Sequence, residues 1–307
     1  MTWQALTLHP PRSFALGESP FWHPHELMLY WVDIEARQVH RCNIFMGTLD
    51  SWAMPSEPGC IAPASGGGLV IALRDGIYRG RDWGGALERI APFDHDTGKI
   101  RFNDGKADPL GRFWASTIYE PRDARDAALF SVDGRGAGKP VVTRQAGDAT
   151  VGNGLAFSPD AKTLYWTDTT SHTIRAWDWD ADANALSGER IFKQWPAKPE
   201  GWKPGDPGYA GRPDGGAVDA AGNYYAAMFE GAQVVKLSPA GEVLAKIPVP
   251  AQCPTMPCFG GDDLKTLYLT TARHNRPAAE LEKYPLSGCV LSMQVDVPGL
   301  PVNFYQD

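Results

Sequence analysis

The 307-residue sequence lacks several features, and each absence excludes a class of protein. The net charge is −7 and no basic block or stripe occurs, so nucleic acid is not an expected partner. No run approaches the roughly 18 apolar residues of a membrane span. The first ten residues have neither the basic nor the apolar region of a signal peptide. We therefore expect a soluble, cytoplasmic protein with no membrane partner.

Cysteine is scarce, and long amphipathic helices are missing. The five cysteines are odd in number and lack metal-binding spacing; they are Cys42, Cys60, Cys253, Cys258 and Cys289. Such a set indicates buried free thiols in a reducing compartment. Because a parallel βαβ sheet needs crossover helices, the lack of helical periodicity disfavours that architecture.

Turn residues and aromatic side chains are abundant instead. The chain has 33 Gly and 26 Pro, together with 11 Trp, 10 Tyr and 12 Phe. This composition is typical of many short strands joined by turns. With 43% hydrophobic and 21% charged residues, the chain can also bury a large core.

Six apolar segments recur at intervals of 40 to 60 residues, each after turn-forming residues. They are 29–33, 69–73, 113–117, 164–168, 224–228 and 267–271. Further strand-like segments follow the first five, at 37–43, 76–79, 128–132, 173–178 and 233–237. This period is that of a propeller blade of four antiparallel strands. We predict an all-β, six-bladed β-propeller in a single domain, 1–307, with 290–296 and 5–8 closing the ring.

Four of the six repeats carry an oxygen-bearing side chain 10 or 11 residues before the apolar segment. These are Glu18, Asn103, Asn153 and Asp214; the other two repeats offer Cys60 or Ile61 and Met256 or Cys258. In a propeller such positions meet at one mouth of the central channel. Two carboxylates and two amides in one small volume favour a bound cation. Oxygen ligands favour Ca²⁺, Mg²⁺ or Mn²⁺, and the lack of a recurring His leaves Zn²⁺ and Fe²⁺ as weaker candidates.

Each of these residues also has an ordinary explanation. Asn103-Asp104-Gly105 is a hairpin-turn signal, and Pro213-Asp214-Gly215 is a common turn sequence. The segment around Glu18 reads as a solvated loop, and Asn153 between two glycines suits a left-handed backbone. The shared spacing is what favours a common site.

The longest interval between repeats contains the Pro- and Gly-rich stretch 195–213, with two Trp and one Tyr. It is either a surface loop between blades four and five or a lid or wall over a pocket, since long ordered loops are often binding elements.

Five motifs in order resemble the gluconolactonase/regucalcin (senescence marker protein) family of six-bladed propellers. They are Leu16-Gly-Glu-Ser-Pro-Phe-Trp22, Arg101-Phe-Asn-Asp-Gly-Lys106, Asn153-Gly-Leu-Ala-Phe-Ser-Pro-Asp160, Pro213-Asp-Gly-Gly-Ala-Val-Asp219, and the stretch 257–273. Together they cover nearly the whole chain. The resemblance implies that Glu18, Asn153 and Asp214 hold a divalent metal. It also implies that Arg101, Asn103 and Glu120 contact the hydroxyls of a sugar lactone.

On this basis we expect a metal-dependent hydrolase that opens an aldonolactone, such as a glucono-, galactono-, arabinono- or xylonolactone, to its acid. A divalent ion (Ca, Mn, Mg, Zn or Fe) would polarise the carbonyl, with Asp214 as general base. Asp104 would hold the metal ligands or the substrate-binding residues in position without contacting the substrate itself. No Gly-x-Ser-x-Gly elbow is present, which disfavours a covalent acyl-enzyme.

Two other readings remain open at this point. One keeps the metal and changes the ester, giving a phosphotriesterase or arylesterase propeller. The other is a non-catalytic calcium-binding or interaction propeller, although the Gly-His…Trp-Asp pattern of WD repeats is missing. The sequence leaves the oligomeric state open, and a monomer is compatible with it.

Overall fold

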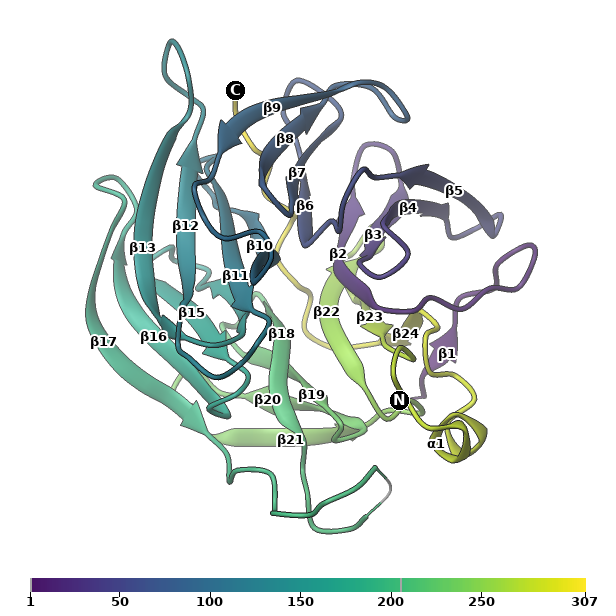
Figure 1. Ribbon diagram of the computed structural model, residues 1–307. Coiled ribbons are helices and arrows are strands. Elements are labelled where there is room, and N and C mark those ends of the chain that lie inside the picture. The colour runs from purple at the N-terminus through teal and green to yellow at the C-terminus, as the bar shows by residue number, and fades with distance from the viewer. Residues whose placement is uncertain (1, 205) are drawn as a thin grey trace.

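The computed structural model describes residues 2–204 and 206–307, and its strands form six four-stranded antiparallel sheets arranged as the blades of a ring (Figure 1). The prediction of an all-β, six-bladed propeller is confirmed. In the first five blades the four strands follow one another in sequence, from the innermost strand outward.

The strands of the blades have the following bounds. Blade one contains β2 (Gly17–His23), β3 (Met28–Asp33), β4 (Gln38–Asn43) and β5 (Thr48–Ala53). Blade two contains β6 (Cys60–Pro63), β7 (Leu69–Leu73), β8 (Gly76–Gly80) and β9 (Leu87–Pro92). Blade three contains β10 (Ile100–Ala107), β11 (Phe113–Tyr119), β12 (Ala127–Asp133) and β13 (Val141–Ala149). Blade four contains β14 (Gly152–Phe157), β15 (Thr163–Asp168), β16 (Thr173–Asp180) and β17 (Ala185–Gln194). Blade five contains β18 (Arg212–Val218), β19 (Tyr224–Phe229), β20 (Gln233–Leu237) and β21 (Val243–Pro248).

The sixth blade closes the ring by combining both ends of the described chain. It contains β22 (Pro254–Gly260), β23 (Thr266–Thr271) and β24 (Leu291–Gln294), with β1 (Gln4–Ala5) as its outermost strand. The register pairs Gln4 with Ser292 and Ala5 with Leu291. Closure by the two predicted segments is therefore confirmed, although β1 shares only Ala5 with the predicted stretch 5–8.

The six repeated apolar segments are the second strands of the blades. The candidate polar residues lie on the innermost strands, each of which directly precedes the second strand of its blade. They do not lie in the connections that lead into the innermost strands. The physical reason is burial: the second strands pack between the neighbouring blades, and β7 is buried at all five positions. Strands covered on both faces show the most continuous apolar sequence, which is why they dominate the repeat pattern.

Aromatic side chains fill the space between neighbouring blades. Trp114 of blade three meets Phe157 and Trp179 of blade four, with ring centroids 5.8 and 5.9 Å apart. The edge-on geometry of both pairs is the one that aromatic quadrupoles favour. Each side chain of this size contributes on the order of 2–3 kcal/mol when fully buried. This packing holds the blades, and hence the innermost strands, in fixed positions.

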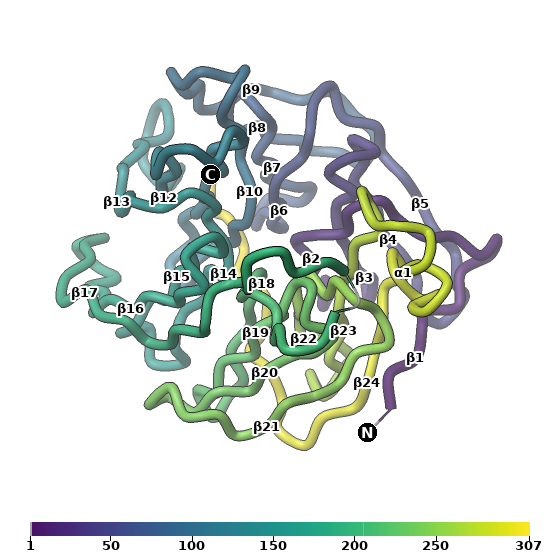
Figure 2. The backbone as a smooth tube through the Cα atoms, turned by 60° about the horizontal axis from the view of Figure 1, so that its bottom comes forward, coloured from purple at the N-terminus to yellow at the C-terminus, as the bar shows by residue number. Residues whose placement is uncertain are grey.

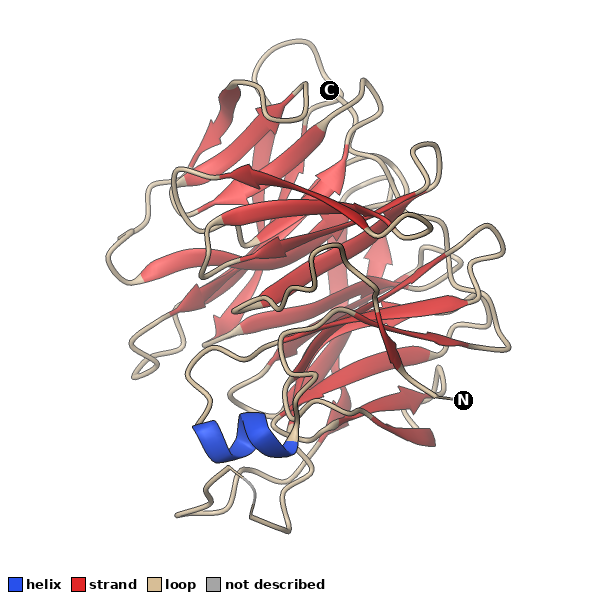
Figure 3. Cartoon of the chain, turned by 90° about the vertical axis from the view of Figure 1, so that its right-hand side faces the viewer, coloured by secondary structure: helices blue, strands red, loops and turns tan. Residues whose placement is uncertain are grey.

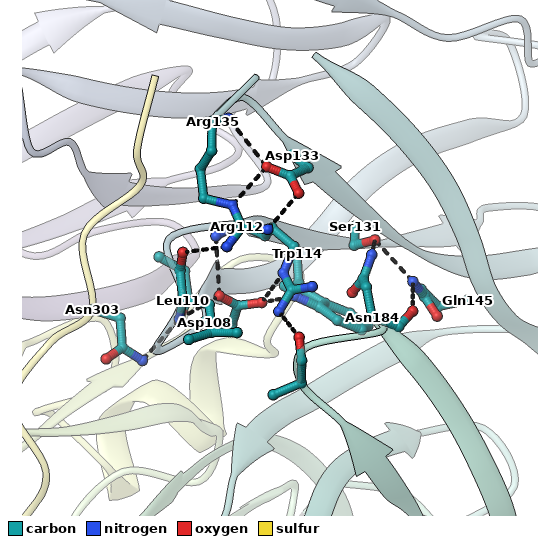
Figure 4. A network of polar contacts seen from close by, with 12 residues as sticks. Asp108, Leu110, Arg112, Trp114, Ser131, Asp133, Arg135, Gln145, Asn184 and Asn303 are labelled. Atoms are coloured by element: carbon teal, nitrogen blue, oxygen red, sulfur yellow. Dashed lines mark hydrogen bonds and ion pairs between the residues drawn. The ribbon is translucent and has the colours of Figure 1, made fainter. Parts of the chain in front are cut away.

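A buried polar network stabilises the turn between β10 and β11 (Figure 4). One carboxylate oxygen of Asp108 accepts hydrogen bonds from Arg112 Nε at 2.7 Å and Trp114 Nε1 at 2.8 Å. The other accepts from the backbone N–H groups of Leu110 and Arg112. Arg112 in turn donates to the backbone oxygen of Ala181 in blade four. The turn residues Asp-Pro-Leu-Gly therefore tie two blades together.

The C-terminal segment crosses the end of the ring where the innermost strands finish (yellow in Figure 1). Gly299 bridges Asp219 of blade five, and Tyr305 bridges Ala64 of blade two. Asp307 completes the crossing with an ion pair to the fully buried Arg79 at 2.9 Å. Beneath this segment lies a cavity of about 310 Å³, lined by the ends of the innermost strands and by Leu300.

The opposite end of the ring carries α1 (Ala278–Lys283) and the loop between β17 and β18, which Figure 3 shows together at the lower edge. Among the described residues, no helix is long and apolar enough to cross a membrane. All five cysteines are free thiols as predicted; four are buried, and Cys289 is half-buried.

Candidate metal and substrate site

The candidate site is built from β-bulges in the innermost strands. Pairing between the first and second strands shifts register in five blades, between Glu18 and Phe21, Phe102 and Gly105, Asn153 and Ala156, Pro213 and Gly216, and Pro254 and Pro257. Blade two pairs without such a shift. A bulge adds one residue to a strand and re-aims a side chain. In four blades the bulged segment begins at, or contains, the predicted polar residue.

The loop and turn explanations of these residues are therefore wrong. Glu18, Asn103, Asn153 and Asp214 all lie within strands, and each is buried. Turn sequences such as Asn-Asp-Gly and Pro-Asp-Gly serve here as bulge sequences, because bulges need the same backbone freedom as turns.

Glycines beside the polar residues allow close backbone approach. A Cβ on Gly105 would lie 2.3 Å from the Trp114 backbone oxygen, and one on Gly215 would lie 2.4 Å from Met256 Cβ. Gly154 has φ +59°, in the left-handed region that favours glycine. The positions of the polar side chains thus depend on glycine next to them in three blades.

Two carboxylates at the ends of second strands fix the backbone just before an innermost strand. Asp33 accepts hydrogen bonds from the N–H groups of Ala15 and Leu16, just before Glu18. Asp168 accepts from those of Thr150 and Val151, just before Asn153. The apolar segments 29–33 and 164–168 both read Leu-Tyr-Trp-x-Asp, and their final aspartate places an acceptor where the chain enters the innermost strand. This role of the aspartate was not predicted from the sequence.

A chain of hydrogen bonds joins the amides of blades three and four. Arg101 Nη1 donates to Asn103 Oδ1 at 2.9 Å, and Asn103 Nδ2 donates to Asn153 Oδ1 at 2.8 Å. Asn153 Nδ2 then donates to Thr169 Oγ1 at 2.8 Å. Thr169, which sequence analysis did not single out, fixes the orientation of the Asn153 amide. The Asn153 Oδ1 atom keeps a second lone pair.

Three buried carboxyl groups in this region have a raised pKa. Burial, followed by the charges of Asp214 and Asp104, raises the pKa of Glu18 well above its ordinary range. Burial is also the main cause that raises the pKa of Asp214 to about 8, although Arg212 opposes the shift. The pKa of Asp104 is raised by burial as well. Buried acids that repel one another are stabilised by a cation placed between them.

The donor set fits a hard divalent cation. One oxygen of Asp104 accepts from Leu155 N at 2.9 Å, while Oδ1 is buried without a hydrogen-bond partner in the described structure. We find no hydrogen bond to the Asp214 carboxylate within the described residues. No group of three or more His, Cys, Asp or Glu side chains with metal-binding geometry occurs there either. The predicted set has only two such side chains, Glu18 and Asp214, and takes its third ligand from the Asn153 amide.

The predicted substrate residues form an ion-pair network beside the amides. Glu120 directly follows β11 and lies 3.3 Å from Arg101 Nε and 2.9 Å from Arg74 Nη1. Arg74 also contacts Glu57 at 2.9 Å, and its guanidinium lowers the pKa of Glu57 to about 2 against the effect of burial. Arg101 and Glu120 thus form an ion pair, and Arg74 from blade two holds Glu120 in place. Their predicted contact with a sugar substrate stays a prediction.

The loop between blades four and five folds over this mouth of the ring. Figure 2 shows the loop between β17 and β18 passing across the centre. Tyr209 contacts His172 at 2.6 Å, and Trp202 packs against Tyr209 with ring centroids 5.1 Å apart. Lys198 reaches Glu230 at 2.5 Å. The loop connects blades four and five as expected, and these contacts attach it to both blades.

The fold and these side chains define a six-bladed β-propeller with an oxygen-rich mouth. Residues 16–273 match the family described as SMP-30/Gluconolactonase/LRE-like region. The chain belongs to this family, as its motifs suggested.

Three relatives illustrate the similarity. The chain is 43% identical over 284 residues to a 6-deoxy-6-sulfogluconolactonase of Pseudomonas putida, covering 92% of each chain. It is 36% identical over 266 residues to a pentonolactonase of Haloferax volcanii, covering 85% of this chain and 82% of the relative. The crystal structure of a calcium-binding regucalcin from Agrobacterium tumefaciens superposes with a TM-score of 0.86 at 25% identity, covering 96% and 95% of the two chains. Lactonases, which are carboxylic ester hydrolases, are therefore homologous to nearly the full length of this chain, in agreement with the predicted enzyme class.

Proposed function

We propose that the protein hydrolyses a sugar lactone to the corresponding aldonic acid, with a divalent cation held by Glu18, Asn153 and Asp214. The observation that carries this proposal is the close approach of buried groups from neighbouring blades. A Cβ on Gly154, next to Asn153, would lie 3.0 Å from the Asp214 backbone oxygen, and the charge of Asp214 acts on Glu18. Asn153 is also hydrogen-bonded to Asn103, which accepts from Arg101, the ion-pair partner of Glu120. The lactonase names of the Pseudomonas and Haloferax relatives support the reaction, and the regucalcin described as calcium-binding supports the cation.

The cation supplies Lewis acidity when bound, polarising the lactone carbonyl. The protein's own part in the chemistry begins with Asp214, whose carboxylate takes the proton from the attacking water and returns it to the ring oxygen as the ring C–O bond breaks. Its ionisation requires a nearby positive charge, because burial alone holds the carboxyl protonated near neutral pH. Asp104 accepts the Leu155 N–H on one oxygen, and its other oxygen is buried without a hydrogen-bond partner among the described residues.

Arg101, Asn103 and Glu120 orient the sugar ring through its hydroxyl groups. Arg101 and Glu120 supply donors and acceptors that are already held in place by their ion pair. Asn103 uses both amide hydrogens on Gly152 O and Asn153 Oδ1, so it offers only an acceptor lone pair to the substrate. Such fixed groups reduce the entropy lost when the reacting atoms are brought together.

The proposal is tested by following proton release from a panel of pentono- and hexonolactones, with EDTA-stripped protein and single metals added back. A phosphotriester and an aryl ester are run beside the lactones. We expect one metal to restore lactone opening, and Asp214→Asn to lower kcat at least 100-fold, the lower end of the range of about 10²–10⁴ for a lost general base. Turnover of only the phosphotriester or the aryl ester would overturn the assignment.

A further inference from the structure

The cavity of about 310 Å³ lies at the end of the ring opposite the candidate metal and substrate site. Its walls are later residues of the six innermost strands, and the C-terminal residues 300–303 line it as a cover. The proposed metal ligands Glu18, Asn153 and Asp214 are not among the described residues that line it. The cavity is therefore separate from the place where the lactone is proposed to react.

The lining of this cavity is almost entirely apolar. Phe21, Trp22, Phe157 and Phe259 contribute aromatic rings, and no Asp, Glu, Arg or His occurs among the described lining residues. Enclosed apolar space with few polar groups is typical of sites for small molecules. An apolar cavity of about 150 Å³ can hold benzene, so about twice that volume has room for a chain of about eight carbons.

Lys106 is the one charged side chain in the described lining. It is the penultimate residue of β10, and its Nζ donates a hydrogen bond to the backbone oxygen of Gly216 in β18 at 3.0 Å. The side chain thus reaches from blade three to blade five. An ammonium group has three N–H donors, and this is the one hydrogen bond that it makes within the described structure. It also has no ion-pair partner there, so two donors remain unused beside the cavity.

The hydroxyl and amide side chains of the lining are already engaged with the protein. Their partners are the Ile61 backbone for Ser19, the Ala107 backbone oxygen for Asn303, and the Asp160 carboxylate for Ser158. The free hydrogen-bonding capacity of the cavity therefore lies mainly in the Lys106 ammonium group.

This combination selects the chemistry of an occupant. A charge in apolar surroundings is stabilised by an opposite charge, and two carboxylate oxygens can accept the two unused donors of Lys106. One ammonium group balances one negative charge, so a dianion would bring an uncompensated charge into the cavity. A sugar would leave most of its hydroxyl groups without partners against the apolar walls.

We propose that the cavity binds an apolar monocarboxylic acid of about eight carbons. Its carboxylate pairs with Lys106, and its chain lies between the innermost strands and the C-terminal residues 300–303. This site goes beyond the proposed function, because it requires neither the divalent cation nor a lactone.

The test is calorimetry with octanoate, octan-1-ol and octylamine on the wild-type protein in the presence of Mg²⁺. We expect octanoate to bind about 10- to 100-fold more tightly than octan-1-ol, the effect of a hydrogen bond to a charged group. Octylamine, which is a cation at neutral pH, should bind more weakly than either. The octanoate affinity should be the same in EDTA, because the site does not use the metal.

Lys106→Met removes the charge and keeps an apolar side chain of similar length. It should lower the affinity for octanoate about 10- to 100-fold and leave that for octan-1-ol nearly unchanged. Lys99→Met is the matched control, because it removes an exposed lysine directly before the same strand, where Lys99 pairs with Asp96. It should change neither affinity.

Leu300→Trp is a second variant that leaves all charges in place. Its larger side chain would take up part of the cavity from the C-terminal segment, so octanoate and octan-1-ol should both bind more weakly. Unchanged binding of both compounds in this variant would overturn the location.

Three other results would overturn the proposal. Octanoate and octan-1-ol could bind equally well, octanoate binding could be lost in EDTA and so depend on the metal, or octanoate could fail to bind the wild type at all. The lactonase assignment is tested separately by proton release, and its failure would leave these binding results unaffected.

Discussion

Replacing Asp214 by Asn should stabilise the metal-free protein. Burial raises the pKa of this carboxyl from 3.8 to about 8 in the folded chain, whereas in the unfolded chain it ionises at its ordinary pKa. As pH rises from 4 toward 8, the unfolded state therefore releases a proton that the folded state retains, and stability falls. Below pH 4 both states hold the proton, and the cost disappears.

The size of the stability difference follows from the three pH units between 4 and 7, over which the carboxyl is ionised in the unfolded chain and protonated in the folded chain. Each unit corresponds to 1.36 kcal/mol, so the ionisable group costs about 4 kcal/mol of folding free energy at pH 7. Asp214→Asn removes this cost, because the amide stays neutral. The variant should thus exceed the wild type in unfolding free energy by about 4 kcal/mol at pH 7 and by almost nothing at pH 4.

The assay is urea denaturation in EDTA at pH 4 and pH 7, followed by tryptophan fluorescence. Asp50→Asn, which alters an exposed carboxylate of blade one, serves as the control and should change stability by less than about 0.5 kcal/mol at both pH values. Adding the activating metal should stabilise the wild type and leave the Asp214→Asn variant nearly unchanged. A gain of equal size at both pH values, or no gain at pH 7, would refute the electrostatic reasoning.

Two further substitutions test the framework around the site. Asp307→Ala should destabilise the protein by about 3 kcal/mol in urea denaturation, because it leaves the buried guanidinium of Arg79 without its carboxylate, whereas Glu88→Gln in an exposed pair should cost less than about 1 kcal/mol. A small effect of Asp307→Ala would show that backbone oxygens alone satisfy Arg79. Gly105→Ala should weaken metal binding in calorimetry, because its Cβ would meet the backbone of β11, and Gly136→Ala, with open space around it, should leave binding unchanged. Equal affinities in both variants would contradict the need for glycine in the bulge.

The sequence predicted the blades because the second strands repeat with little variation. Tyr30 and Tyr165 occupy matching positions in the segments Leu-Tyr-Trp-x-Asp, and both are buried between blades. Periodicity of this kind survives in a single sequence, since every blade must fill the same space. The ring closure was also predictable, because the sixth repeat supplied only three strands of its own.

The bulges were not predictable in the same way. Asn103 and Asp214 lie in sequences that suit a turn as well as a bulge, and only pairing with the second strand distinguishes the two. The ion pair between Lys198 and Glu230 was missed for another reason. It joins two segments that are 32 residues apart in the sequence, and it depends on the ring geometry rather than on any local pattern.

The bulge in blade six has a consequence for how this architecture diversifies. Its register shift lies between Pro254 and Pro257, where the strand carries Met256, buried against Gly215. The backbone there already has the displacement that aims side chains of four other blades into the mouth, but it is occupied by a thioether. Exchanging this one side chain for a carboxylate or an imidazole would place another polar group on an innermost strand without an insertion or a new turn. New chemistry in such a ring therefore needs only a point mutation at a position where the strand is already displaced.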